Sequence, residues 1–124
     1  MLYLRPDALF LSDLDLPRTA QKLDDVTIAT PDWACSGGLW NDRMAYGTPA
    51  AMIHYGLRGN HLAAYVAAGW QPHAEAFLAH EMAARGIGNL RSRTVFQRMR
   101  ADGHVDHRDA RLGLLAAWRQ RRQR

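Results

Sequence analysis

The sequence predicts an α/β fold with a small mixed sheet and three to four helices. Short runs of β-branched and aromatic residues alternate with longer segments whose apolar residues recur at helical spacing. Proline and glycine mark the boundaries between them. The chain has 124 residues, of which 48% are hydrophobic and 23% charged. We therefore expect a single domain over residues 1–124, of the α+β class if its strands pair antiparallel.

The first 25 residues predict one or two short strands and a connection. Residues 1–4 (MLYL) have the apolar character of a strand, and Pro6 ends it because proline cannot donate to a sheet. Residues 7–16 continue irregularly or as a second extended piece. Pro17 and the polar residues 18–25 then form a connection.

Two strands and a helix are predicted next. Residues 26–29 (VTIA) suit a buried strand, and residues 44–47 (MAYG) suit another short one. A glycine-rich segment with neither period lies between them. Thr48 is a natural N-cap and Pro49 a favoured first-turn residue, so a helix is expected from there to Gly59. Its apolar face comprises Ala51, Met52 and Tyr55.

Two further helices are predicted in the middle of the chain. Asn60 caps a segment over residues 61–70, whose apolar residues have helical spacing. Pro72 begins the clearest helix, and Gly86 ends it. The apolar positions of the two segments are Leu62, Tyr65 and Val66, then Phe77, Leu78, Met82 and Ala84.

A strand, a turn and a helix are predicted for the remainder. Residues 94–100 (TVFQRMR) predict a strand, because the Ala-Asp-Gly sequence directly after them is typical of a tight turn. Asp106 or Asp109 then caps a last helix. That helix carries Leu112, Leu115 and Trp118.

The composition excludes several classes of protein. Cys35 is the only cysteine, which rules out an internal disulfide and every cysteine-rich zinc pattern. A single cysteine fits a reducing, cytoplasmic setting. No apolar stretch approaches the roughly 20 residues that a membrane span needs, so we expect a soluble protein without a transmembrane segment.

Arginine dominates the basic residues. The net charge is +4, and Lys22 is the only lysine among 16 basic residues. The last eight residues, AWRQRRQR, hold four arginines. This tail is either a solvated helix end, where cations complement the helix dipole, or a docking element for an anionic partner.

Three acidic residues near the N-terminus form the first candidate site. Asp7 follows a strand end, and Asp13 and Asp15 form an Asp-x-Asp pair. Such a pair at the end of a strand can hold a divalent metal that neutralises a diphosphate. The alternative is a turn with solvated carboxylates.

The glycine-rich segment is the second candidate site. Gly37 and Gly38 permit close approach of a ligand to the backbone, and Asn41 follows them. Asp42 is a candidate general base or a ligand of a sugar hydroxyl, and Arg43 pairs with a phosphate or with Asp42. The alternative is a buried Asp–Arg pair that fixes the loop.

The third candidate site is the sequence QRMRADG, with Arg98, Arg100 and Asp102. Alternate residues of a strand point to the same face, so the two guanidinium groups lie together. They either bind a diphosphate or line a solvated face.

Four segments follow one another over about residues 2–103: YLRPDALFL, then GG with NDRMAYGTPAAMIHYGLR, then HAEAFLAHEMAARGI, and finally FQRMRADG. In this order they resemble a family of glycosyltransferase-like proteins of bacterial polysaccharide loci and fungi. The family's motifs are Gly-Gly-x-Asn-Asp-Arg-Phe-Ala-x-Gly, His-x-Glu and Arg-x-Arg-Ala-Asp-Gly. This chain has an extra Trp40 in the first motif and Met44 in place of its Phe.

The resemblance implies a GT-A-type fold that binds a nucleotide-sugar. Family members are about twice as long, and this chain resembles their C-terminal half. An N-terminal half supplied separately, or a second copy of the chain, is then expected to cover an exposed sheet edge.

The resemblance also assigns site residues. Asp42, Arg43 and Glu75 are the implied catalytic residues. Asp7, with Asp13 and Asp15, is implied to lie near a metal, with Mn²⁺ or Mg²⁺ as the candidate ion. The implied donor-binding residues are Asp7, Gly37, Gly38, Asn41, His73, Arg98, Arg100 and Asp102.

The expected function is therefore transfer of a sugar from a nucleotide-sugar to a hydroxyl of a carbohydrate acceptor, in a complete form or in an incomplete, inactive one. The alternative is a non-catalytic α/β interaction module whose basic C-terminal tail binds a protein or nucleic-acid partner. Nucleic acid is not the partner expected from the leading interpretation.

Overall fold

The computed structural model describes residues 1–33 and 40–106, together with residues 111, 115, 118 and 122. Its main sheet has four strands in the order β1 (Leu2–Leu4), β4 (Met44–Gly47), β3 (Thr27–Pro31) and β5 (Gly88–Ser92). β1 and β3 each pair antiparallel with β4, and β3 and β5 are parallel. The α/β class and the mixed sheet predicted from the sequence are confirmed.

Two more strands and the helices complete the described fold. β2 (Ala8–Phe10) and β6 (Phe96–Arg98) form a separate antiparallel ribbon. The helices are α1 (Leu16–Thr19), α2 (Pro49–Leu57), α3 (Leu62–Ala67) and α4 (Ala74–Ala84), with 3₁₀ turns η1 (Ala20–Lys22) and η3 (Arg58–His61).

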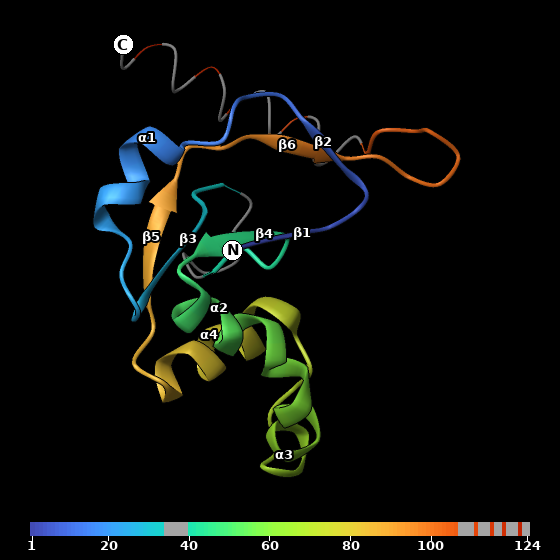
Figure 1. Cartoon of the computed structure of the whole chain (residues 1–124). Coiled ribbons are helices and arrows are strands. Elements are labelled where there is room, and N and C mark those ends of the chain that lie inside the picture. The colour runs from blue at the N-terminus through green and yellow to red at the C-terminus, as the bar shows by residue number, and fades with distance from the viewer. Residues whose placement is uncertain (34–39, 107–110, 112–114, 116–117, 119–121, 123–124) are drawn as a thin grey trace.

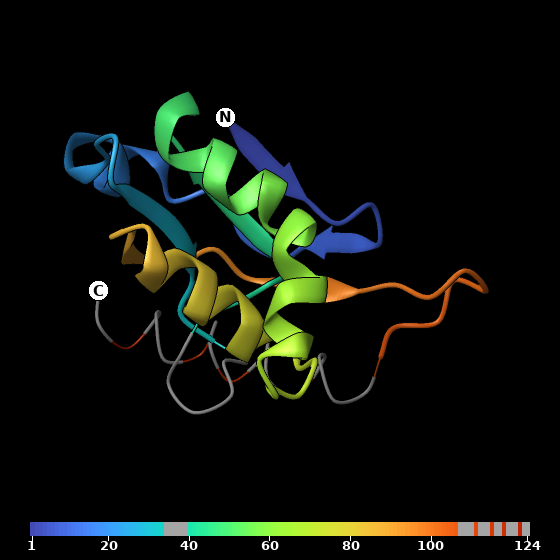
Figure 2. The same ribbon diagram turned by 90° about the horizontal axis from the view of Figure 1, so that it is seen from below.

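The elements are arranged in layers (Figure 1). The β2–β6 ribbon and α1 lie on one side of the main sheet, and α2, α3 and α4 lie on the other. Seen from below, α2 and α4 run side by side across the sheet (Figure 2). Each face of the sheet therefore has its own core.

The core between the helices and the sheet is apolar. Met52 and Leu78 bring α2 and α4 onto Ile28 of β3, and all three side chains are fully buried. The remaining members of this core are Ala45, Ala51, Tyr55, Met82 and Ile87. Burial of these apolar side chains is the main force that holds the helices to the sheet.

The core on the opposite face combines apolar and hydroxyl side chains. Val95 and Phe96 pack there against Met44 of the sheet. Beneath α1, four buried hydroxyl groups are joined in one chain of hydrogen bonds, of 3.0, 3.0 and 2.9 Å. In order, they belong to Thr19, Tyr46, Ser92 and Thr94. Each hydroxyl therefore has the partner that a buried polar group needs.

Local signals at the start of α2 predicted it correctly. The Thr48 hydroxyl accepts a hydrogen bond from the Ala51 amide at 3.3 Å, as an N-cap does. A Cβ at Gly56, near the end of this helix, would stand 2.2 Å from the hydroxyl oxygen of Tyr3, so the Tyr3 ring would have to move. The Tyr3 side chain of β1 thus packs directly against the backbone of α2.

Several predicted boundaries were wrong. Asn60 does not cap α3, since His61 occupies that position after the η3 turn. α4 begins at Ala74 with His73 as its N-cap, not at Pro72. β5 and α1 were not predicted at all. Residues 88–92 (GNLRS) contain no β-branched residue, and their strand conformation comes from parallel pairing with β3.

The predicted last helix falls mostly outside the described residues, as do Gly37, Gly38 and most of the basic tail. Arg111, Leu115 and Trp118 are helical. Within the described part of the chain, every helix is too short or too polar to cross a bilayer.

Candidate functional site

Asn41 holds together the backbone on either side of the glycine-rich segment. Its side chain is fully buried. The amide nitrogen donates to the Trp33 carbonyl at 2.8 Å, and the amide oxygen accepts from the Arg43 N–H at 3.0 Å. Asn41, predicted to bind the donor, thus makes hydrogen bonds to the protein backbone in this structure.

Asp42 and Arg43 lie where this segment meets β4. The Asp42 carbonyl accepts a hydrogen bond of 2.9 Å from the Tyr55 hydroxyl. The Arg43 guanidinium carbon lies 5.9 Å from the centroid of the Trp33 ring, and the Arg43 carbonyl accepts from the Arg5 N–H at 3.3 Å. Both predicted catalytic residues are half-buried, so each has an exposed part that a ligand can reach.

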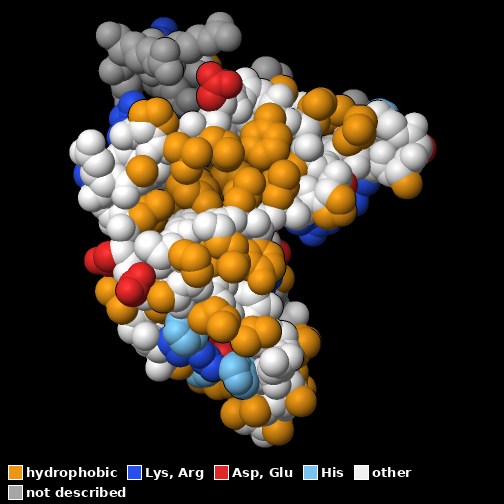
Figure 3. Space-filling model, in the orientation of Figure 1, with side chains coloured by type: hydrophobic (Ala, Val, Ile, Leu, Met, Phe, Trp, Pro, Cys, Tyr) orange, Lys and Arg blue, Asp and Glu red, His pale blue; other side chains and the backbone are white. Residues whose placement is uncertain are grey.

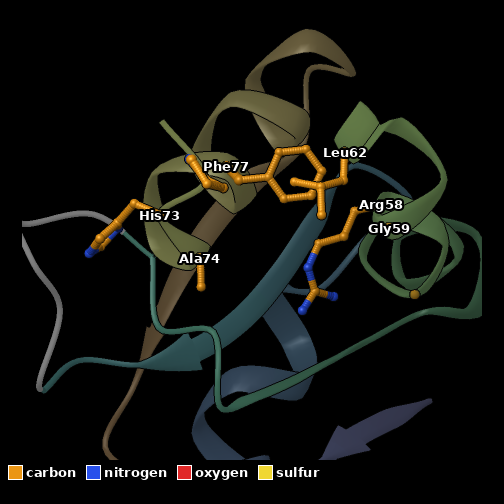
Figure 4. A pocket seen from close by; sticks show the side chains of 8 residues that line it. Arg58, Gly59, Leu62, His73, Ala74 and Phe77 are labelled. Atoms are coloured by element: carbon orange, nitrogen blue, oxygen red, sulfur yellow. The ribbon is translucent and has the colours of Figure 1, made fainter. Parts of the chain in front are cut away.

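A cavity of about 420 Å³ lies between the end of α2 and the start of α4, and its lining includes neither Asp42 nor Arg43. Arg58 connects the two features. Its guanidinium lies 4.2 Å from the Tyr55 ring centroid and donates to the Tyr55 carbonyl. Arg58 and His73 stand on opposite flanks of an apolar wall that includes Leu62 and Phe77 (Figure 4). The cavity also touches Gly56, Gly59, Pro72 and Ala74.

Tyr55 has a strongly shifted pKa. Its side chain is 3% exposed, and burial raises the pKa of its hydroxyl to about 12, against the opposing effect of the Arg58 charge. The pKa of Tyr55 in the folded chain exceeds the ordinary value near 10. The stabilisation that the folded chain gains from the neutral Tyr55 hydroxyl is therefore complete below pH 10 and is lost between pH 10 and 12.

We therefore expect the free energy of unfolding of the native chain to fall by about 1 kcal/mol more than that of Tyr55→Phe between pH 9 and pH 11. Urea unfolding at the two pH values measures the difference. Equal losses in the two proteins would contradict the assignment of this alkaline step to Tyr55.

His73 and Glu75 both lie at the start of α4. The His73 ring nitrogen Nδ1 accepts from the Ala76 N–H at 3.4 Å and caps the helix. Glu75 is in the first turn with 7% of its surface exposed. A negative charge in the first turn of a helix is stabilised by the positive end of the helix dipole.

A cluster of three polar side chains fixes the two walls of the cavity to each other. The Glu81 carboxylate of α4, 5% exposed, lies 2.8 Å from Nδ1 of His61 and 2.7 Å from a guanidinium nitrogen of Arg85. His61 belongs to η3, which also carries Arg58 and Gly59. The position of η3, and with it the side of the cavity formed by Arg58 and Gly59 (the Arg58 wall), therefore depends on this cluster.

Asp7 is bound by an arginine. Arg5 donates to both of its carboxylate oxygens, at 2.9 and 2.8 Å. The Arg5 hydrogen bonds hold the pKa of Asp7 below its ordinary value, although desolvation acts in the opposite direction. Asp7 also accepts the Met99 N–H at 2.7 Å, through its carbonyl, and so lies beside β6.

The predicted Arg98–Arg100 pair does share one face. Both guanidinium groups lie near the Asp106 carboxylate, at 3.4 Å and 2.7 Å. Asp102 accepts the His104 N–H at 2.9 Å, and Gly103 has a φ of 82°. The predicted tight turn is confirmed, and these residues close a hairpin.

Asp13 and Asp15 lie at a different hollow, of about 520 Å³. Oδ2 of Asp15 accepts from Arg18 at 2.7 and 2.5 Å and from the Arg93 N–H at 3.0 Å. Desolvation acts to raise the pKa of Asp15, but these hydrogen bonds outweigh it and the pKa lies below its ordinary value. The hollow is lined by Ser12, Asp13, Leu14, Asp15, Pro17, Arg18 and Arg93.

The three carboxylates predicted to hold Mn²⁺ or Mg²⁺ do not fit a common metal centre. Arginine neutralises Asp7 and Asp15 separately. No three histidine, cysteine, aspartate or glutamate side chains are grouped to hold a metal within residues 1–33 and 40–106 or at the four described positions beyond them. Metal dependence stays a prediction from the resemblance.

The structure brings some predicted residues together and separates others. His73 lines one cavity together with Arg58, whereas Asp13 and Asp15 line another. Asp42 is connected to the first cavity only through the hydrogen bond from Tyr55 to its carbonyl. Sequence reasoning did not single out Arg58. The available signal was its i, i+3 spacing from Tyr55, which places the two side chains together on a helical surface.

Comparison with known proteins adds no relative. No family model matches this sequence, and neither a curated protein nor a solved structure matches it.

Proposed function

We propose that this chain transfers a sugar from a nucleotide-sugar to a hydroxyl acceptor, using the cavity between α2 and α4 for the donor. The observation that carries the proposal is the 420 Å³ cavity with Arg58 and His73 on its flanks and apolar side chains between them. Its volume is within the usual range for small-molecule sites. A guanidinium beside an apolar wall suits a nucleotide-sugar, in which a charged diphosphate lies between a base and a sugar ring.

In the proposed reaction, the Asp42 carboxylate takes the proton of the acceptor hydroxyl. The hydroxyl oxygen bonds to the anomeric carbon as the bond from that carbon to the diphosphate breaks. The nucleoside diphosphate leaves with the added negative charge, which Arg58 stabilises. Because the carboxylates of Asp7 and Asp15 are bound by arginine, no step is assigned to a metal.

Thermal unfolding in the presence of UDP, GDP, CMP and their sugars tests binding, with and without Mn²⁺. A ligand at about 100 times its Kd stabilises the folded state by roughly 2.7 kcal/mol, which raises the midpoint by several degrees. We expect one nucleotide to give this shift. Arg58→Gln should abolish it, and Arg111→Gln, at an exposed arginine of the C-terminal segment, should retain it.

Asp42→Asn separates chemistry from binding. We expect the midpoint shift with the donor to remain and the turnover of the donor to fall by about 10²–10⁴-fold, the usual contribution of a general base. A cooperative melt with no shift for any nucleotide would overturn the proposal. So would unchanged turnover in Asp42→Asn.

The second candidate is a non-catalytic interaction module. The observation that favours it is the exposed apolar surface around β1, where Leu2, Tyr3 and Leu4 are 41–44% exposed. A module of this kind would melt cooperatively, show no nucleotide shift, and still depend on that surface for association.

A further inference from the structure

Among residues 1–33 and 40–106, β1 pairs with β4 on one side only, so its outer edge is left without a neighbouring strand. β1 is the terminal strand of the sheet, next to β4. Met1 exchanges hydrogen bonds with Gly47 at 2.7 and 3.1 Å, and the Arg5 N–H donates to Arg43 at 3.3 Å. In an antiparallel pair the hydrogen-bonded positions alternate, so the backbone groups of Leu2 and Leu4 point away from β4.

Apolar side chains lie on both sides of this edge. Leu2 and Leu4 are opposite Tyr46 and Met44 in the register, so they extend the core beneath the β2–β6 ribbon to the sheet edge. Phe10 of the ribbon is 37% exposed. Figure 3 shows a broad hydrophobic area between the ribbon and β1, with a smaller one over α2.

The helical face of the edge is apolar as well. Tyr3 packs against Tyr55 with a ring-centroid distance of 5.8 Å and against Gly56. Ile53, one turn before Gly56 on the same face of α2, is 50% exposed.

We propose that β1 pairs antiparallel with β1 of a second copy of this chain, so that two four-stranded sheets join into one of eight strands. In the register centred on Tyr3, Leu2 of each copy exchanges two hydrogen bonds with Leu4 of the other. The sequence Leu-Tyr-Leu is unchanged by this twofold operation. The contact is therefore self-complementary, as a twofold interface must be.

The same operation also matches the layers on both faces. Leucines of one copy meet leucines of the other on the ribbon side, and the exposed face of α2 meets its counterpart on the helical side. β1 carries no proline, lysine or bulge of the kind that protects a solvent-exposed edge. A second copy thus covers the apolar side chains of β1 on both faces of the sheet.

The apolar area suits a dimer of modest size. Each of Met1, Leu2, Tyr3, Leu4, Phe10 and Ile53 is 37–57% exposed. With about 150–200 Å² for a large side chain, they leave roughly 500 Å² per copy. Two copies bury about 1,000 Å² before backbone and polar atoms are added, close to the lower limit of about 1,200 Å² for specific interfaces.

The charges at the ends of the strand do not oppose this register. Arg5 lies opposite Met1 of the second copy, so a guanidinium approaches an N-terminal ammonium. Asp7 neutralises that guanidinium through two hydrogen bonds, and the ammonium donates to the Gly47 carbonyl. Each cation therefore already has its partner.

Light scattering coupled to gel filtration tests association of the full chain. We expect a mass of twice 14.0 kDa at micromolar concentration. Leu2→Lys combined with Leu4→Lys should raise the dissociation constant of the dimer by at least about 100-fold, because both exposed leucines lose their apolar contacts in each copy. Leu16→Lys, at an equally exposed leucine of α1, should leave it unchanged.

Cysteine cross-linking tests the register in a Cys35→Ser background. Tyr3→Cys should form an intermolecular disulfide under mild oxidation, since the two residues lie about 5 Å apart across the twofold axis. Leu2→Cys should not, because its own counterpart lies about 8 Å away.

Three results would overturn the proposal. They are a monomer at every concentration up to about 200 µM, a dimer that survives the paired lysine substitutions, and Leu2→Cys that cross-links as readily as Tyr3→Cys. A monomer that binds nucleotide would leave the proposed function standing, because Leu2 and Leu4 do not line the cavity.

Discussion

Asn41→Ala is expected to lower the free energy of unfolding by about 2–4 kcal/mol. The substitution removes two hydrogen bonds and leaves the Trp33 carbonyl and the Arg43 N–H without this partner. It also leaves a void where a fully buried side chain had been. Urea unfolding of the native chain and of the variant measures the loss.

Asn41→Asp tests the hydrogen bond that Asn41 donates separately from the one that it accepts. Aspartate has nearly the same shape and still accepts from the Arg43 N–H, but it has no N–H to donate to the Trp33 carbonyl. A buried charge adds a further cost. We expect a loss of stability in both variants, whereas Asn60→Ala, at an exposed asparagine, should be neutral. If Asn41→Ala unfolds at the same urea concentration as the native chain, the backbone role of Asn41 is wrong.

Asn41 has a structural role within the predicted donor-binding motif. The Asn-Asp-Arg sequence drew attention because its residue types suit sugar and phosphate chemistry. In the structure its first residue binds backbone on both sides, and Asp42 and Arg43 retain exposed surface. A polar side chain that completes its hydrogen bonds within the fold cannot be distinguished in sequence from one that awaits a ligand.

The parts of the fold that depend on local signals were predictable. Thr48 and Pro49 mark the start of α2, and Gly86, with a φ of 65°, follows α4 as expected. β4 was predicted with its observed limits, Met44–Gly47. In each case the relevant interactions lie within a few residues of one another.

The parts that depend on distant contacts were not predictable in the same way. β5 is a strand because it pairs with β3, some 60 residues earlier in the chain. The cavity exists because α4 returns beside η3, where it brings His73 toward Arg58. Asp7 and Asp15, close together in the sequence, bind Arg5 and Arg18 separately. Proximity in sequence suggested a shared metal site that the folded backbone does not assemble.

The cavity walls themselves depend on a buried charge. Glu81 is 5% exposed and has Arg85 and His61 as its partners. We expect Arg85→Leu to lower the free energy of unfolding by about 2–4 kcal/mol, because it leaves the Glu81 carboxylate buried with only His61 beside it. Arg85→Lys retains the charge and should cost less.

The double variant Arg85→Leu, Glu81→Leu separates the cost of a lone charge from the value of the pair. When both charges are replaced by apolar side chains, no buried carboxylate is left uncompensated, so we expect the double variant to regain most of the stability lost in Arg85→Leu. A double variant less stable than Arg85→Leu would show that the ion pair itself stabilises the fold. Because His61 holds η3 to α4 through Glu81, Glu81→Leu should also loosen the Arg58 wall. In Glu81→Leu, a smaller nucleotide-induced rise of the thermal unfolding midpoint, measured against the unliganded midpoint of the same variant, would connect the cluster to the cavity.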